Sequence, residues 1–256
     1  MRKGSLIAAV SALLILSACS YLPEFPAGSL AAGVSVTETR EAITLEKTGG
    51  PVNSTGFMFY PGGLVDPHAY MPWLADLAAD GVPVVIAKAP GNLAVINPDA
   101  GLTLQSILPG VSSWVVGGHS LGGVMAAWSA YDNPQAWKAV IFLAAYPSDT
   151  KSLAAWPHPV LSLSASNDGL ATPAQISAAS PLLPVPQQTL VTTSDPYPTA
   201  NGGGYTVLHQ IVGGVHAQFG SYGAQQGDGT PSITRAAQQA EVVAFIVEFF
   251  QKNGWL

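Results

Sequence analysis

The sequence predicts an α/β domain in which a mostly parallel sheet is covered by helices on both faces. Apolar, strand-like runs alternate with helix-like segments over most of the chain, which is the pattern of such a sheet. The abundant glycines and prolines, 27 and 21 in number, stand between the apolar runs, where turns are needed. With 256 residues and 48% hydrophobic side chains, the chain is sufficient for one domain with a sizeable core.

The expected elements follow one another in a regular order. The first two strands are short and partly alternating, and we expect them to pair as an antiparallel hairpin at the sheet edge. The pair Asp66-Pro67 has the character of a helix N-cap followed by proline. Strands are expected over residues 34–39, 42–47, 56–60, 82–87, 113–118, 137–145, 159–165, 188–193 and 205–212. Helices are expected over 66–79, 122–131, 173–179 and 232–253, with broken helix over 92–110 and a turn over 195–204.

Composition argues against several functions. The formal net charge is −6, only 9% of residues are charged, and no basic run occurs. Phosphate neutralisation needs clustered Lys and Arg, so the sequence argues against nucleic-acid binding. No repeat has the period of a solenoid or a propeller.

The N-terminus has the pattern of an export signal. Arg2 and Lys3 precede an apolar run that is too short to span a bilayer, and the run ends in Leu16-Ser-Ala-Cys19. This tetrad resembles the bacterial lipobox, in which cleavage precedes the cysteine and its thiol is lipidated. Cys19 is the single cysteine, so no disulfide within the chain is possible. The alternative is an ordinary secretory signal in which Cys19 is incidental.

We therefore expect three regions along the chain. Residues 1–18 are predicted to be a lipoprotein signal peptide, and residues 19–33, with their prolines and small side chains, a lipid-attached tether. Residues 34–256 are the predicted domain. The implied location is the bacterial cell envelope, where lipid on Cys19 would anchor the protein to a membrane on the extracytoplasmic side.

Ser120 is the candidate nucleophile. It lies in Gly118-His-Ser-Leu-Gly122, a Gly-X-Ser-X-Gly motif that follows an apolar strand and precedes a helix. Small flanking glycines permit the strained turn that raises such a serine above the sheet. A serine hydroxyl is a poor nucleophile at neutral pH, so it needs a base, an orienting acid and hydrogen-bond donors for the developing oxyanion.

The expected acid and base come later in the chain. Asp168 follows the strand predicted over 159–165, at a carboxyl end, where ligands bind in open α/β sheets. Asp195, after the next strand, is the alternative acid. His216 follows the last strand and precedes the last helix, and it is the expected base. His209 is the alternative, although it stands inside an apolar strand-like run.

Two backbone N–H groups are expected to bind the oxyanion. One is that of Leu121, directly after the serine, and the other is that of Gly63, with Leu64 as an alternative. His119 is expected to pack beside the pocket. Further candidates for the pocket wall are Tyr60, Leu64, His119, Leu170 and Phe219.

Five segments carry a resemblance to a known family. The chain is similar to the fold-5 group of alpha/beta hydrolases, which is often described as dienelactone-hydrolase-like, over about residues 53–250. The segments are Tyr60-Pro-Gly-Gly-Leu-Val-Asp66, Gly117-Gly-His-Ser-Leu-Gly-Gly123, Ala144-Ala-Tyr-Pro147, Ser166-Asn-Asp-Gly169 and His216-Ala-Gln-Phe-Gly220. The resemblance implies an α/β-hydrolase fold, a triad of Ser120, Asp168 and His216, and no cofactor. Dienelactone hydrolases proper use a cysteine nucleophile, so their substrate is not transferred to this chain.

The leading hypothesis is the hydrolysis of a small-molecule carboxylic ester. An acyltransferase with the same triad is one alternative, and a catalytically silent, lipid-anchored binding module is another. The segment between the strands over 137–145 and 159–165 has room for little more than one helix, over 149–156. We therefore expect no large lid and an open site.

Overall fold

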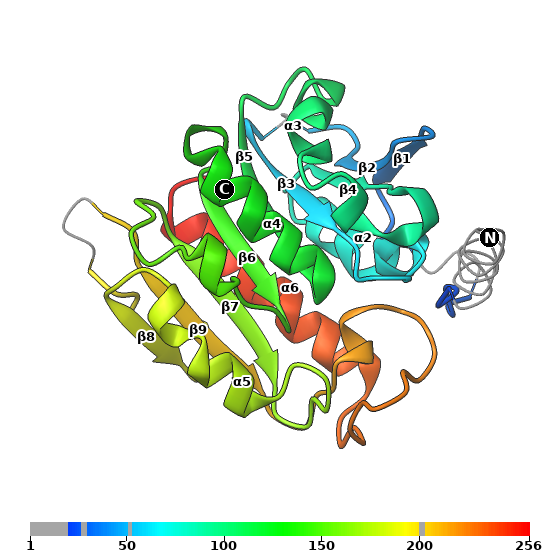
Figure 1. The fold of residues 1–256 in the computed structure, drawn as a ribbon. Coiled ribbons are helices and arrows are strands. Elements are labelled where there is room, and N and C mark those ends of the chain that lie inside the picture. Colours follow the sequence, from blue (N-terminus) through cyan, green and yellow to red (C-terminus); the bar gives the residue numbers. More distant parts are fainter. Residues whose placement is uncertain (1–19, 27–29, 51–52, 200–202) are drawn as a thin grey trace, which may run out of the picture.

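The computed structural model describes residues 20–26, 30–50, 53–199 and 203–256, and within them the chain forms one nine-stranded sheet (Figure 1). The predicted signal peptide, residues 1–18, and Cys19 lie outside the described residues. The strand order is β1-β2-β4-β3-β5-β6-β7-β9-β8. The bounds are β1 Val34–Glu38, β2 Ala42–Lys47, β3 Thr55–Tyr60, β4 Val84–Ala87, β5 Ser113–His119, β6 Ala139–Leu143, β7 Val160–Ala165, β8 Gln187–Leu190 and β9 Thr206–Ile211.

The sheet is parallel except at one edge. β2 runs antiparallel to both β1 and β4, with Thr37 opposite Thr44 in the outer pair, and every other neighbouring pair is parallel. The hairpin expected at the edge is therefore confirmed. The central strands β3 to β7 are buried along almost their whole length. This burial explains why the sequences of β4 and β6 are continuously apolar, whereas in β7 two buried serines, Ser162 and Ser164, alternate with apolar residues.

Helices cover both faces of the sheet, as predicted. α2 and α6 pack on one face, around a core that includes Trp73 and Phe249. α3 and α4 pack on the other face, around a second core that includes Trp137 and Met125. The α-helices are α2 Met71–Ala79, α3 Ala100–Leu104, α4 Leu121–Asp132, α5 Pro173–Ala178 and α6 Arg235–Lys252. Each fully buried aromatic or aliphatic side chain contributes about 1.5–3 kcal/mol to this packing.

The connection between β6 and β7 contains less helix than expected. Instead of a helix over 149–156, the structure has a single turn of 3-10 helix, Asp149–Lys151. Ser152 is already extended, with φ −65° and ψ 133°, and Pro157 disfavours helical backbone at the residue before it. No large lid is therefore present among the residues that the structure describes.

The N-terminal segment Ser20–Pro26, which we expected to be part of a tether, packs along the domain. The Tyr21 N–H donates to the Leu64 carbonyl at 2.8 Å, and the Asp66 N–H donates to the Tyr21 carbonyl at 3.0 Å. The Glu24 N–H donates to the Ser221 carbonyl at 2.7 Å. The segment thereby connects the loop after β3 with the loop that follows β9.

Deleting this segment should weaken the fold. A chain that begins at residue 27 loses these three backbone hydrogen bonds, so its free energy of unfolding should be about 1–3 kcal/mol below that of a chain that begins at residue 20. Urea unfolding of the two forms measures the difference. Equal midpoints and slopes would show that the contacts of Ser20–Pro26 do not stabilise the domain.

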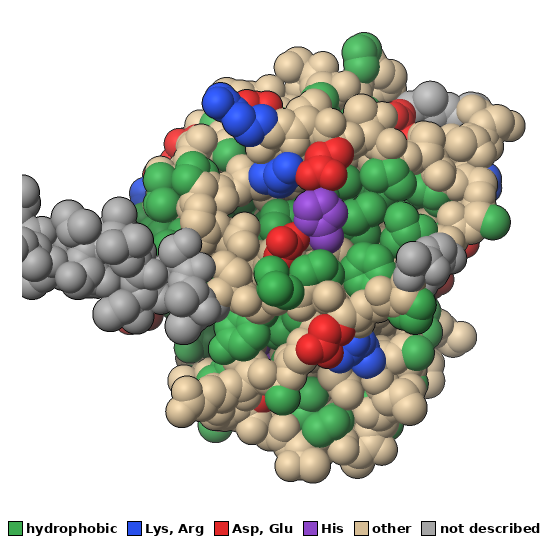
Figure 2. Space-filling model, turned by 90° about the vertical axis from the view of Figure 1, so that its right-hand side faces the viewer, with side chains coloured by type: hydrophobic (Ala, Val, Ile, Leu, Met, Phe, Trp, Pro, Cys, Tyr) green, Lys and Arg blue, Asp and Glu red, His purple; other side chains and the backbone are tan. Residues whose placement is uncertain are grey.

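The surface carries few charges, and some of them form one connected cluster. On the face in Figure 2, acidic, basic and histidine side chains gather among hydrophobic and uncharged ones. The ion pairs of Glu38, Asp66, His68 and Lys88 form a cluster of this composition, with the His68 ring 2.6 Å from the Asp66 carboxylate and 3.1 Å from that of Glu38. It connects the β1–β2 hairpin to the loop after β3. No helix of the described residues is long and apolar enough to cross a membrane.

Candidate active site

Ser120 occupies a strained turn between β5 and α4. Its backbone has φ 52° and ψ −124°, a conformation that non-glycine residues rarely adopt. The Ser120 N–H donates to the Leu143 carbonyl on β6 at 3.0 Å, which holds the turn against the sheet. A Cβ on Gly122 would lie 2.1 Å from the Tyr60 carbonyl oxygen, so the close approach of α4 to β3 requires glycine there. Close packing of α4 against β3 therefore explains why the last position of the Gly-X-Ser-X-Gly motif is a glycine.

Strain gathers around this turn. Among the residues that the structure describes, four that are not glycine have positive φ: Leu64 (63°), Asn92 (56°), Ser120 (52°) and Ala144 (48°). Leu64 and Asn92 contact each other, and Ala144 lines the same pocket as Ser120. Such conformations cost about 1–3 kcal/mol each and cluster at functional sites, so they mark this end of the sheet as a candidate site.

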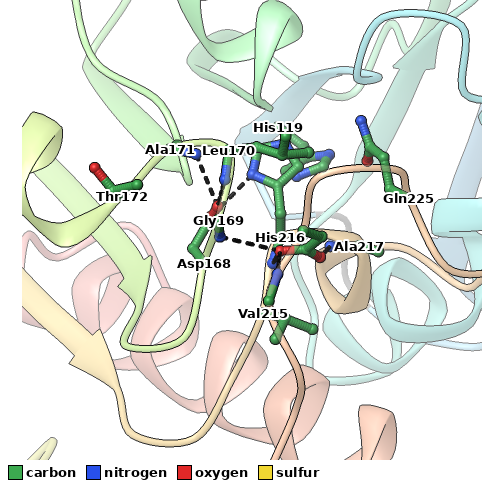
Figure 3. A network of polar contacts seen from close by, with 12 residues as sticks. His119, Asp168, Gly169, Leu170, Ala171, Thr172, Val215, His216, Ala217 and Gln225 are labelled. Carbon is green, nitrogen blue, oxygen red and sulfur yellow. Dashed lines mark hydrogen bonds and ion pairs between the residues drawn. The ribbon is translucent and has the colours of Figure 1, made fainter.

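Asp168 and His216 form a buried pair at the carboxyl ends of β7 and β9 (Figure 3). His216 Nδ1 lies 2.8 Å from Asp168 Oδ2, and the side chains are 2% and 0% exposed. The other carboxylate oxygen, Asp168 Oδ1, accepts the N–H groups of Leu170 at 2.8 Å and Ala171 at 2.7 Å. Because Nδ1 is engaged by the acid, Nε2 is the ring nitrogen of His216 that is left for a reacting group.

Neither alternative acid nor alternative base lies at this site. Asp195 accepts the N–H groups of Val191 and Thr192 in an exposed turn after β8, at the far edge of the sheet. His209 is a structural residue. Its Nδ1 donates to the Leu190 carbonyl at 2.9 Å, its Nε2 lies 2.6 Å from Glu241, and its ring stacks on Phe245.

The two residues that carry the expected oxyanion donors are neighbours in space. A Cβ on Gly63 would lie 3.0 Å from Leu121 Cδ2, so the loop after β3 touches the first residue of α4. The alternative donor is already used, because the Leu64 N–H donates to the Asn92 carbonyl at 2.8 Å. The Gly63 and Leu121 N–H groups form no hydrogen bond with any residue that the structure describes. They are the backbone donors available here.

Ser120 and His216 open into one pocket of about 420 Å³. No hydrogen bond joins the Ser120 hydroxyl to the His216 ring in the described part of the chain, and catalytic contacts of this kind commonly tighten only when substrate binds. Most of the wall is small or apolar. It consists of Ser120, Leu121, Val124, Ala144, Ala145, Tyr146, Leu170, Ala171, His216 and Gln225.

Of the further candidates for the pocket wall, only Leu170 lines the pocket. Tyr60 is buried elsewhere, with its hydroxyl on the Pro98 carbonyl, and Phe219 belongs to the core. Sequence reasoning did not assign Tyr146 or Gln225 to the wall. The position of Tyr146 at a carboxyl end of β6 was the available signal, whereas Gln225 lies in a long loop that carries no pattern.

Asp228 is a second acid at the site that the sequence reasoning missed. Its carboxylate accepts the backbone N–H groups of His216 at 3.1 Å, Ala217 at 2.8 Å and Gly169 at 3.2 Å. It therefore ties the loop that carries the expected base to the loop that carries the expected acid. Its place between Gly227 and Gly229 indicates a turn, but nothing in that motif names its partners.

Replacing Asp228 with Ala should loosen the base loop. Four N–H groups lose their acceptor, because Gly229 also donates to this carboxylate at 2.7 Å. We therefore expect a loss of about 1–3 kcal/mol in stability and about a tenfold loss in kcat for ester hydrolysis. Asp195→Ala is the matched control, because that carboxylate also accepts two backbone N–H groups but lies away from the pocket. An Asp228→Ala enzyme that loses stability as the control does, yet keeps full kcat, would contradict the role given to Asp228.

The described residues contain no cluster of three or more His, Cys, Asp or Glu side chains suited to a metal ion.

No curated protein is significantly similar to this chain. Among solved structures, a predicted CIB-like hydrolase from Thermoplasma acidophilum is 15% identical, with a TM-score of 0.58 over 86% of this chain and 100% of that one. An alpha/beta hydrolase fold protein from Chitinophaga pinensis is 14% identical, with a TM-score of 0.53 over 87% and 98% of the two chains. A model of the alpha/beta hydrolase family matches residues 56–240. The protein therefore belongs to the alpha/beta hydrolase family, with a function of the hydrolase type.

Proposed function

We propose that this protein is a serine hydrolase that cleaves carboxylic esters through an acyl-enzyme. One observation carries the proposal. Ser120, in a strained turn at φ 52°, shares a pocket with His216, and the His216 ring is held by the buried carboxylate of Asp168 at 2.8 Å. A nucleophile, a base and an orienting acid are the parts that acyl transfer needs.

In the proposed reaction, Ser120 Oγ attacks the ester carbonyl while His216 Nε2 takes the hydroxyl proton. Asp168 stabilises the imidazolium that forms and keeps the ring in the tautomer that accepts at Nε2. The N–H groups of Gly63 and Leu121 donate to the oxyanion of the tetrahedral intermediate. His216 then gives its proton to the leaving alcohol. Water, deprotonated by His216, then attacks the acyl-enzyme. The bond between Ser120 Oγ and the acyl carbon breaks, His216 returns the proton to Ser120 Oγ, and the carboxylic acid leaves.

The pocket favours small esters. Its volume of about 420 Å³ is at the lower end of ligand sites, its wall is mostly small and apolar, and no large lid covers it in the described residues. A panel of p-nitrophenyl esters from acetate to palmitate tests the proposal. We expect kcat/KM to be highest for short acyl chains. Turnover of none of these esters by the folded protein would support a binding module, and acyl transfer to an added alcohol in preference to water would support an acyltransferase.

We also propose that lipid on Cys19 anchors the enzyme to a membrane outside the cytoplasm. The support is the sequence Leu16-Ser-Ala-Cys19 after an apolar run, with a single cysteine in the chain. Growth with an alkyne analogue of palmitate in the producing bacterium should label the wild type. Cys19→Ser should lose the label and leave the membrane fraction. A labelled Cys19→Ser protein would contradict the anchor.

A further inference from the structure

His119 is a buried ionisable residue that the proposed reaction does not use. It ends β5, directly before Ser120, and is 1% exposed. Its ring lies beside that of His216, with 4.4 Å between the centroids and 48° between the planes (Figure 3). Buried polar side chains are normally hydrogen-bonded, so the partners of His119 determine what it does beside the expected base.

Tyr70 joins His119 to the oxyanion loop, by which we mean residues 61–64 after β3. The Gly62 N–H donates to the Tyr70 hydroxyl at 3.0 Å, and this hydroxyl lies 2.9 Å from His119 Nδ1. Burial raises the pKa of Tyr70, so the hydroxyl keeps its proton. It accepts from Gly62, and His119 Nδ1 is the one acceptor within reach of its proton among the described residues, so the buried hydroxyl is satisfied when it donates to His119 Nδ1.

These contacts fix the state of the His119 ring. With Nδ1 as acceptor, the ring proton is on Nε2. Burial, and then the neighbouring His216, lower the pKa of His119 well below its ordinary value, so the ring is uncharged. An uncharged ring adds no like charge beside the imidazolium that His216 becomes during the reaction. His119 Nε2 is buried and makes no hydrogen bond of ordinary geometry with a described residue, although the His216 backbone is close enough to offset part of the fall in pKa. The hydrogen bond with Tyr70 is therefore the well-formed one on this ring.

The oxyanion loop also rests directly on this pair. A Cβ on Gly62 would lie 2.9 Å from both His119 Nδ1 and the Tyr70 hydroxyl oxygen. Tyr70 is itself immobilised, because it is fully buried and packs at 4.8 Å on Phe59. The position of Gly63, the next residue of the loop, therefore depends on a rigid pair that also touches His216.

We propose that Tyr70 and His119 are positioning residues, which hold the Gly63 N–H at the oxyanion and His216 at Ser120 in one fixed arrangement. This inference rests on the proposed serine hydrolase function. An oxyanion exists only after attack on the ester, so a loosened Gly63 donor weakens the transition state and leaves ground-state binding almost unchanged. The expected signature is a fall in kcat at constant KM.

The test compares Tyr70→Phe with Tyr205→Phe in the protein that begins at residue 20. Tyr205 is a matched control, because its buried hydroxyl donates to Asn253 Oδ1 at 3.0 Å, away from the pocket. With p-nitrophenyl acetate, Tyr70→Phe should lose about 10–100-fold in kcat, with KM within about twofold. Phenylboronic acid forms a tetrahedral adduct on a reactive serine, and its affinity should fall by a similar factor. Tyr205→Phe should change neither value.

Substitution of His119 gives a second, independent comparison. His119→Asn keeps a carbonyl acceptor near the position of Nδ1, so it should retain most of the activity and of the boronate affinity. His119→Leu cannot accept from Tyr70 and should behave as Tyr70→Phe does. Equal activity of His119→Asn and His119→Leu at equal folded fraction would overturn the inference.

The remaining outcomes separate this inference from the proposed function. If a fluorophosphonate labels wild-type Ser120 but Tyr70→Phe keeps its kcat and boronate affinity, the positioning role is wrong and the hydrolase proposal stands. If both tyrosine variants lose activity only in proportion to lost stability, the positioning role is also wrong. If wild-type Ser120 reacts with no fluorophosphonate, the proposed function fails, and this inference fails with it.

Discussion

Replacing Ser120 with Ala should lower kcat for p-nitrophenyl acetate by about 10⁴-fold or more, because the attacking oxygen is removed. The fold should be unaffected. Alanine keeps the Cβ, and the turn is held by a backbone bond, from the Ser120 N–H to the Leu143 carbonyl, while the serine hydroxyl bonds to no residue in the described part of the chain. Initial rates at saturating ester measure the loss, and a thermal melt verifies the fold.

Ser35→Ala is the control for this substitution. Ser35 lies on the exposed edge strand β1, and its hydroxyl donates to the Glu46 carbonyl at 3.2 Å. Its loss should leave kcat unchanged. Turnover of the ester by Ser120→Ala at the wild-type rate would refute the assignment of the nucleophile.

Asp168→Asn should be the second most damaging change, at about 10³–10⁴-fold in kcat. Asp168 Oδ1 accepts two backbone N–H groups, from Leu170 and Ala171, so the oxygen of an Asn amide must take that place. The amide NH₂ then faces His216 Nδ1 and donates to it. His216 is forced to carry its proton on Nε2, where it can no longer accept the proton of Ser120.

The structure offers a close control for this exchange in Asp195→Asn. That carboxylate also accepts two backbone N–H groups, at 2.7 and 2.9 Å, but in an exposed turn. Its exchange should leave kcat at the wild-type level. If Asp168→Asn lost no more activity than Asp195→Asn, the buried pair with His216 would have no part in the reaction.

The architecture was readable from the sequence because each element carries its own signal. The apolar run of β5, for example, is buried and predicts a central strand. Gly118 and Gly122 flank Ser120 and allow α4 to lie close to β3, so they predict the turn between strand and helix. The chain order of Ser120, Asp168 and His216 then follows the strands, since the carboxyl ends of parallel strands meet at one edge. Local pattern and topology together were therefore sufficient to predict that these three residues lie at one end of the sheet.

What the sequence did not reveal depends on contacts between distant backbone groups. The Asp228 carboxylate accepts the N–H of Gly169, 59 positions away. Because every residue except proline has such an N–H group, the sequence does not identify the partner. The packing of Tyr21 along the loop after β3 could not be predicted for the same reason, because it depends on the backbone N–H and carbonyl of Tyr21 and not on its side chain. The missing helix over 149–156 has a local cause, since Pro157 restricts Trp156, whereas the expected helix was inferred from the length of the connection alone.

The most direct test of the proposed function is covalent labelling of the wild type with a fluorophosphonate, followed by peptide mass mapping. The account predicts a single label per chain on the peptide that contains Ser120, loss of esterase activity in proportion to labelling, and no label on Ser120→Ala. A label on another residue, or ester turnover that persists after Ser120 is fully labelled, would contradict it.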